Sequence, residues 1–187
     1  MDRTVRIANG QGFWGDSPDA AWEQVVRGPI DYLGLDYLAE VTLSIMMRQR
    51  LRDPHKGYAT DFIGFLRRAL PEIVKRGVKV VTNAGGLNPG ACREEVFRLA
   101  RELGVTGLAV GVVEGDDLLP RLAELCSLGH HLEHMDTGRR LCEVPHGKVL
   151  SANVYLGARP VAEALDGGAQ IVLAGRITDT SLALGPL

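Results

Sequence analysis

The stretch VKVVTNAGGLNPGACREEVFRLARELG, residues 78–104, contains the signals of a strand, a loop and a helix in succession. Val78–Thr82 is a short, β-branched, apolar run that is typical of a buried strand. Asn88 stands where a helix cap is expected, and Gly104 closes a segment with helical periodicity, so Pro89–Leu103 is predicted to be a helix. A strand followed directly by a helix is the repeating unit of a parallel α/β sheet.

The same alternation recurs along the whole chain. Further strands are predicted at Val5–Ala8, Ile30–Leu35, Gly107–Val112, Val149–Val154 and Ile171–Ala174. Helices are predicted at Asp19–Arg27 (with Ser17 as its cap), Leu38–Leu51, Asp61–Lys75 (kinked or broken at Pro71), Leu118–Cys126 and Pro160–Leu165. Turn-rich residues near 129–150 predict a small β-hairpin insertion. We therefore predict a Rossmann-like α/β fold with a mostly parallel sheet and helices on both faces.

The composition excludes several classes of protein. Apolar residues make up 45% and charged residues 24% of the 187 residues, as in soluble globular proteins. The net charge is −2 with Lys and Arg scattered, which argues against nucleic acid as a partner. No apolar run approaches the roughly 20 residues that span a bilayer, and no signal peptide is recognisable. With three cysteines that lack metal-site spacing, we expect a reduced, cytoplasmic protein without a membrane partner.

The end of the chain bears on its domain organisation. The sequence stops soon after the strand predicted at Ile171–Ala174, whereas a parallel sheet normally covers its last strand with a helix. We therefore expect residues 1–187 to form a single α/β domain that is the N-terminal part of a longer chain. We also expect a homo-oligomer.

Polar residues gather where the predicted strands end. They are Asn9, Gly10, Gln11 and Asp16 after the first strand, Asp36 and Glu40 after the second, Asn83, Gly85 and Gly86 after the third, Glu114 after the fourth, Asn153 at the end of the fifth, and Arg176, Thr178 and Asp179 after the last. The carboxyl ends of parallel strands share one edge of the sheet, and ligands bind there. We therefore predict one pocket at this edge, lined by Asp16, Asp36, Asn83 and Arg176, for a small-molecule acid or acyl-CoA.

Four carboxylates of this set are the acid–base candidates, namely Asp16, Asp36, Glu40 and Asp179. The residues assigned to substrate binding are Asn9, Gly10, Gln11, Asn83, Gly85, Gly86, Asn153, Arg176 and Thr178. Several of these oxygens suit Mg²⁺ or Mn²⁺, so a divalent metal is a candidate cofactor with no assigned ligands.

The glycines of Gly10–Gly15 match the pattern G-x-G-x-x-G of dinucleotide-binding loops. In such loops the third glycine lies inside the first turn of the following helix. Here Ser17 and Pro18 place the helix start after that glycine, and the bulky pair Phe13-Trp14 stands where the loop has to be tight. A dinucleotide cofactor is therefore not expected. The loop either presents polar side chains to a substrate or is a structural turn.

Two other strand ends each have two interpretations. Gly85 and Gly86 allow close backbone approach, and the helix that follows offers free amides to a carboxylate or phosphate, although every strand-to-helix unit needs some such loop. Arg176 can clamp a carboxylate with two parallel hydrogen bonds, or it can pair with Asp179 to close a loop.

Five of these segments together resemble the N-terminal domain of the acyclic terpene utilisation protein family: IANGQGFWGDS, DYLGLDYLAEVTLSIM, TNAGGLNP, SANVYLGARPVAEAL and IVLAGRITDTSLALGPL. The resemblance covers nearly the whole chain. It implies a role in the bacterial catabolism of citronellol- and geraniol-type acids, as a lyase or hydratase acting on a hydroxylated glutaryl-type intermediate. It assigns no catalytic role to any residue, so a non-catalytic binding or assembly subunit is the alternative.

Overall fold

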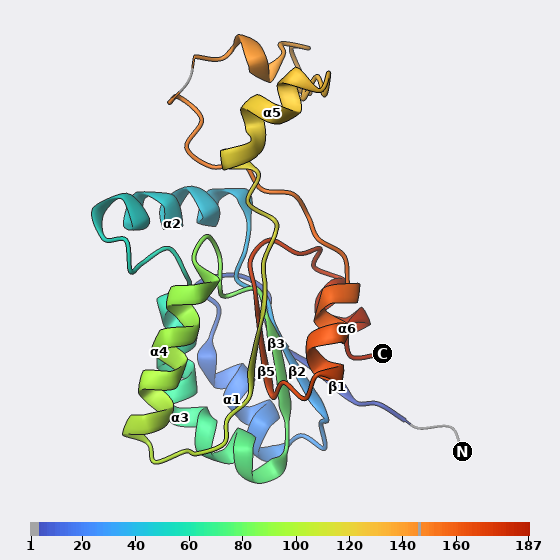
Figure 1. Cartoon of the computed structure of the whole chain (residues 1–187). Helices are drawn as coiled ribbons and strands as arrows, with labels where there is room; N and C mark the ends of the chain where they lie inside the picture. The colour runs from blue at the N-terminus through green and yellow to red at the C-terminus, as the bar shows by residue number, and fades with distance from the viewer. Residues whose placement is uncertain (1–3, 146) are drawn as a thin grey trace.

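The fold was described from a computed structural model, in which residues 4–145 and 147–187 are placed (Figure 1). Five parallel strands form one open sheet in the order β1-β2-β3-β5-β4. Their bounds are Ile7–Gln11 for β1, Tyr32–Leu35 for β2, Lys79–Thr82 for β3, Val110–Val113 for β4 and Ile171–Ala174 for β5. The predicted α/β class with a parallel sheet is confirmed.

The helices fill the gaps between the strands. They are α1 Pro18–Arg27, α2 Glu40–Arg52, α3 Thr60–Arg76, α4 Pro89–Glu102, α5 Leu122–Ser127, α6 Arg159–Asp166 and α7 Ser181–Leu184, with short 3₁₀ turns η1 Leu119–Arg121 and η2 Leu141–Glu143. Asn88 caps α4 as predicted, because its side chain accepts a hydrogen bond from the backbone N–H of Ala91. Gly77 ends α3 in the left-handed region at φ 68°.

The buried apolar residues form two clusters, one on each face of the sheet. Successive side chains of a strand point to opposite faces, so Val80 and Leu173 pack with α1, α3 and α4. Their neighbours Val81 and Val172 pack instead with α6 and α7. Strand β5 is buried along its whole length, which explains its uninterrupted apolar sequence. The predicted placement of helices on both faces is confirmed.

The order of the strands creates a topological switch point between β3 and β5. The chain leaves β3 for α4 on one face and leaves β5 for α7 on the other, although these two strands are neighbours. Crevices at the carboxyl ends of such strand pairs are the usual ligand sites of open α/β sheets. Helix α2 and the segment that carries α5 lie at this edge of the sheet (Figure 1).

Two predicted β features are absent from the described residues. Val149–Val154 is not a strand, because only Asn153 pairs, in a single antiparallel bridge with Asp117. The hairpin expected near 129–150 is reduced to one antiparallel bridge between Glu133 and Arg140. The apolar residues of Val149–Val154 have no neighbouring strand with which to form a ladder, so their β propensity alone did not produce a strand.

The predicted break of a helix at Pro71 is wrong, and the predicted cap at Ser17 is right in position only. Helix α3 continues through Pro71, which is exposed, while Leu70 and Ile73 beside it are fully buried and keep the helix packed on the sheet. Ser17 occupies the cap position of α1, but its side chain makes no capping hydrogen bond. Across the residues described, no helix is both long and apolar enough to cross a membrane.

Candidate functional site at the switch point

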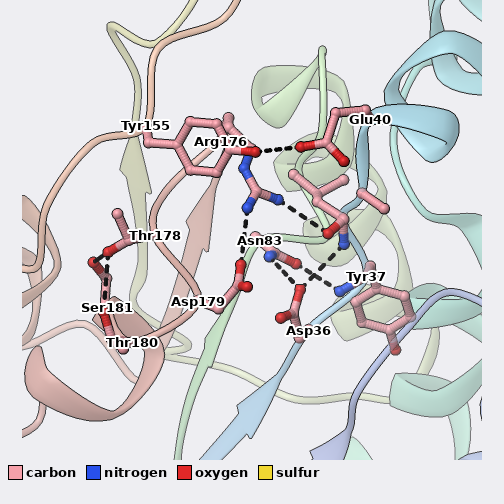
Figure 2. Close-up of polar contacts among 12 residues, drawn as sticks. Asp36, Tyr37, Glu40, Asn83, Tyr155, Arg176, Thr178, Asp179, Thr180 and Ser181 are labelled. Atoms are coloured by element: carbon pink, nitrogen blue, oxygen red, sulfur yellow. Dashed lines mark hydrogen bonds and ion pairs between the residues drawn. The ribbon is translucent and has the colours of Figure 1, made fainter.

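Asp36 and Asn83 form a hydrogen-bonded pair at the ends of β2 and β3 (Figure 2). The Nδ2 of Asn83 donates to Oδ1 of Asp36 at 2.6 Å, and the backbone N–H of Leu38 donates to the same oxygen at 3.2 Å. The amide oxygen of Asn83 accepts from the backbone N–H of Tyr37 at 2.7 Å. Since Asn83 is fully buried and bonded at both ends, its orientation is fixed.

Arg176 lies beside this pair at the end of β5 and is only 4% exposed. Its Nη1 donates to the carbonyl of Leu38 at 3.0 Å, and its Nη2 pairs with Asp179 at 2.8 Å. Its Nε has no hydrogen-bond partner among the residues described. The ring of Tyr155 stacks on the guanidinium at 4.1 Å, and the Tyr155 hydroxyl donates to Glu40 (Figure 2). The guanidinium therefore has a buried Nε without a hydrogen-bond partner and an aromatic ring stacked on its face.

Asp116 fixes the backbone that carries Arg176. Its Oδ2 accepts from the backbone N–H of Arg176 and from Nδ2 of Asn153, each at 2.8 Å. A Cβ on Gly175 would lie 2.7 Å from this oxygen, so only glycine leaves room for the buried carboxylate. Sequence reasoning missed both Asp116 and Tyr155. The available signal was position, since Asp116 follows the end of β4 and Tyr155 lies in the segment SANVYLG.

The residues described so far form one polar cluster, made of Asp36, Glu40, Asn83, Asp116, Asn153, Tyr155, Arg176 and Asp179. Its carboxyl groups differ in their electrostatics. Burial raises the pKa of Asp36, and the carboxylate of Asp179 adds to the rise, while the hydrogen bonds from Asn83 and Leu38 and the charge of Arg176 offset part of it. The hydrogen bond from Tyr155 lowers the pKa of the exposed Glu40. Of these two acids, Asp36 is therefore the one whose surroundings favour the protonated form.

A hollow of about 200 Å³ adjoins the cluster. It shares Asp116 and Asn153 with the cluster, and Arg50, Asn88 and Glu114 also line it. Arg50 is partly engaged, because its Nη1 donates to the carbonyl of Leu87 at 2.8 Å. The carboxyl edge at the switch point thus combines a buried cation, a carboxyl group with a raised pKa and free space.

The residues predicted after β1 lie in a different place. Asp16 and Gln11 line a separate hollow of about 300 Å³ together with Asp61 and Arg68 from α3. The carboxylate of Asp16 accepts from the backbone of Gly12 at 3.1 Å and of Ser17 at 2.7 Å, and so closes its own loop. The single pocket predicted for Asp16 with Asp36, Asn83 and Arg176 is therefore divided, and only the last three come together.

The glycine and asparagine of the same loop have packing roles. A Cβ on Gly10 would lie 2.8 Å from Cβ of Ala21, so this glycine lets α1 approach the sheet. The exposed Asn9 holds its amide oxygen over Gly34, where a Cβ would lie 2.8 Å away. Neither residue contacts the Arg176 cluster in the hydrogen bonds found among the described residues.

Gly85 and Gly86 lie close to neighbouring protein backbone, and Gly86 also lines the hollow of about 200 Å³. A Cβ on Gly85 would lie 2.6 Å from the carbonyl of Ala174, and one on Gly86 would lie 2.9 Å from the carbonyl of Gly57. The amides of Gly86, Leu87 and Asn88 donate to backbone carbonyls of the protein. These contacts give the two glycines a packing role, and anion binding by this loop stays a prediction.

The remaining hydroxyl groups after β5 bond mainly to one another. Oγ1 of Thr178 lies 2.6 Å from Oγ of Ser181, and the hydroxyl of Thr180 donates to Thr178 at 3.3 Å (Figure 2). These bonds shape the start of α7. Across residues 4–145 and 147–187, no group of three or more His, Cys, Asp or Glu side chains is arranged to hold a metal ion.

Comparison with known proteins identifies the family. The family described as acyclic terpene utilisation family protein AtuA matches residues 5–187. The chain belongs to this family. Its members are named for the use of acyclic terpenes, which agrees with the resemblance carried by the strand-end motifs. No significant match was found among curated proteins or solved structures.

Proposed function

We propose that this member of the acyclic terpene utilisation family is an enzyme of acyclic terpenoid or branched acyl-CoA catabolism, and that its substrate binds at the switch point. The observation that carries the proposal is the position of Leu38, whose backbone bonds to both groups. Its carbonyl accepts from the guanidinium of Arg176 at 3.0 Å, and its N–H donates to Asp36 at 3.2 Å. A buried cation and a carboxyl group of raised pKa are thereby held side by side.

This pair suits chemistry next to a carbonyl group. Arg176 offers positive charge in a site shielded from water, where it stabilises a carboxylate or a carbonyl oxygen that gains negative charge. Asp36 takes or returns the proton, because its raised pKa brings it closer to the pH at which general acid–base catalysis is efficient. Lyases and hydratases of hydroxylated glutaryl-type thioesters need both functions. Glu40 and Asp179 hold Tyr155 and Arg176 in place.

The test is turnover by the full-length protein. Incubation with 3-hydroxy-3-methylglutaryl-CoA and with longer branched hydroxyacyl-CoA homologues, followed by mass spectrometry, is expected to show cleavage or dehydration of at least one thioester. Asp36→Asn is expected to reduce this turnover roughly 100-fold or more while leaving binding intact. Asp166→Asn is the matched control, because Asp166 is exposed and ends α6 at the opposite edge of the sheet.

A non-catalytic binding or assembly subunit is the second candidate. It is favoured by the internal hydrogen bonds of the cluster, since Nη1 and Nη2 of Arg176 and Oδ1 of Asp36 already have protein partners. Thioester binding without turnover in the wild type, with equal binding by Asp36→Asn, would establish this candidate and contradict the enzyme.

A further inference from the structure

A larger cavity lies in the segment between β4 and α6, outside the polar cluster. Its volume is about 430 Å³, within the range of sites that bury small molecules. The residues that line it include Leu119, Leu122, Cys126, Leu141, Val144 and Val149. In the described part of the chain, every lining residue is aliphatic, proline, cysteine or glycine. Such a lining rejects charged groups and favours hydrocarbon.

The cavity is built from both arms of this segment. Leu122 and Cys126 are one helical turn apart on α5 and so share a face, and Leu141 belongs to the facing turn η2. Cys126 is half-buried and not in a disulfide. Its thiol is therefore a built-in reporter of what occupies the cavity.

The base of the segment is tied to the polar cluster. The backbone N–H of Leu118 donates to Ala152 at 2.7 Å, and that of Val154 donates to Asp116 at 2.8 Å. Asp116 in turn holds the backbone of Arg176 at 2.8 Å. Leu119 lines the cavity and is three residues from Asp116, so their Cα atoms are at most about 11 Å apart. One end of the cavity therefore lies close to the residue that holds the backbone of Arg176.

We propose that this cavity binds the branched hydrocarbon chain of an acyclic terpenoid acid or thioester, with its acidic end directed toward Arg176. The assignment of the acidic end rests on the proposed function, whereas the assignment of the chain rests on the cavity itself. A hydrocarbon tail gains roughly fourfold in affinity for each methylene removed from water. Ligand length is thus the property that this cavity selects.

The test compares two acids that share a head group and differ in chain length, geranic acid and 3-methylbut-2-enoic acid, by calorimetry on the full-length protein. Geranic acid is expected to bind at least tenfold more tightly. Leu122→Gln is expected to remove most of this advantage without changing the affinity of the short acid. Leu128→Gln is the matched control, because Leu128 follows α5 and is 65% exposed. It is expected to change neither affinity.

A second measurement uses the wild-type protein, so it does not depend on whether a variant folds. Geranic acid is expected to slow the alkylation of Cys126 by N-ethylmaleimide at least fivefold, while 3-methylbut-2-enoic acid does not. Equal affinity for the two acids, or unchanged labelling of Cys126, would overturn the proposal. Arg176→Lys separates the two hypotheses. If it leaves both affinities unchanged while Leu122→Gln acts as expected, the chain site stands and the head-group assignment fails.

Discussion

Replacement of Asp116 by alanine is expected to destabilise the fold although the residue lies at the end of the sheet. The substitution removes the acceptor of two hydrogen bonds of 2.8 Å, from the backbone of Arg176 and from the side chain of Asn153. Hydrogen bonds to a charged group contribute about 1.5–3 kcal/mol each. Asn153 is half-buried and can turn toward water, so its bond counts less than that of the buried amide. We expect a loss of about 3 kcal/mol in the free energy of unfolding.

Urea unfolding followed by tryptophan fluorescence measures this loss. Asp117→Ala is the control, because Asp117 is exposed and its side chain accepts from the backbone of Leu119, so it is expected to cost less than about 1 kcal/mol. Gly175→Ala is a second test of the same contact, because its new Cβ would lie too close to the carboxylate of Asp116. It should be less harmful in the Asp116→Ala background than in the wild type. Equal losses for Asp116→Ala and Asp117→Ala would refute the reasoning.

Three further outcomes follow from individual residues. Because burial raises the pKa of Asp36 in the folded state, its contribution to stability is present at low pH and lost as pH rises through that pKa. Asp36→Asn should therefore be more stable than the wild type at neutral pH. Denaturant titrations should show this difference in the free energy of unfolding shrinking toward about pH 4. Gly86→Ala should lower the free energy of unfolding by about 2–3 kcal/mol, because φ is 55° and the carbonyl of Gly57 lies 2.9 Å from the new Cβ. Gly90→Ala should not, because nothing lies within 4 Å of its Cβ. Equal melting temperatures of the two variants would contradict this. Burial raises the pKa of the Cys92 thiol, so iodoacetamide should label it only on unfolding, and labelling of native protein would show that the core opens.

Part of the fold could be predicted because local and global signals agree. Ile171–Ala174 was predicted with its observed bounds, because a strand that is buried on both faces is an uninterrupted apolar run with clear ends. Asp36, Asn83 and Arg176 could be brought together from topology alone, because parallel strands end at one edge. Asp16 was wrongly added to them. The shared edge of parallel strands predicts on which edge of the sheet a residue lies, but not how far it lies from the other residues of that edge.

The rest depends on tertiary contacts that leave little trace in one sequence. Tyr155 reaches Arg176 and Glu40 from a segment with no regular structure, so no periodicity marks it. The glycines at 85 and 86 fit a ligand loop and a packing loop equally well until the neighbouring backbone is known. The apolar residues around Leu122 resemble ordinary core, and only the three-dimensional arrangement shows that they surround a cavity.

The most direct test of the central claim is the affinity of the full-length protein for an acid and for its uncharged amide, measured by calorimetry in the wild type and in Arg176→Lys. If the buried guanidinium binds the acidic end of the ligand, geranic acid should bind more tightly than geranamide. Arg176→Lys should then weaken the acid by about 1–3 kcal/mol, because an ammonium does not reproduce the planar donor geometry, and leave the amide little changed. Equal affinity of wild type and Arg176→Lys for geranic acid would contradict the claim.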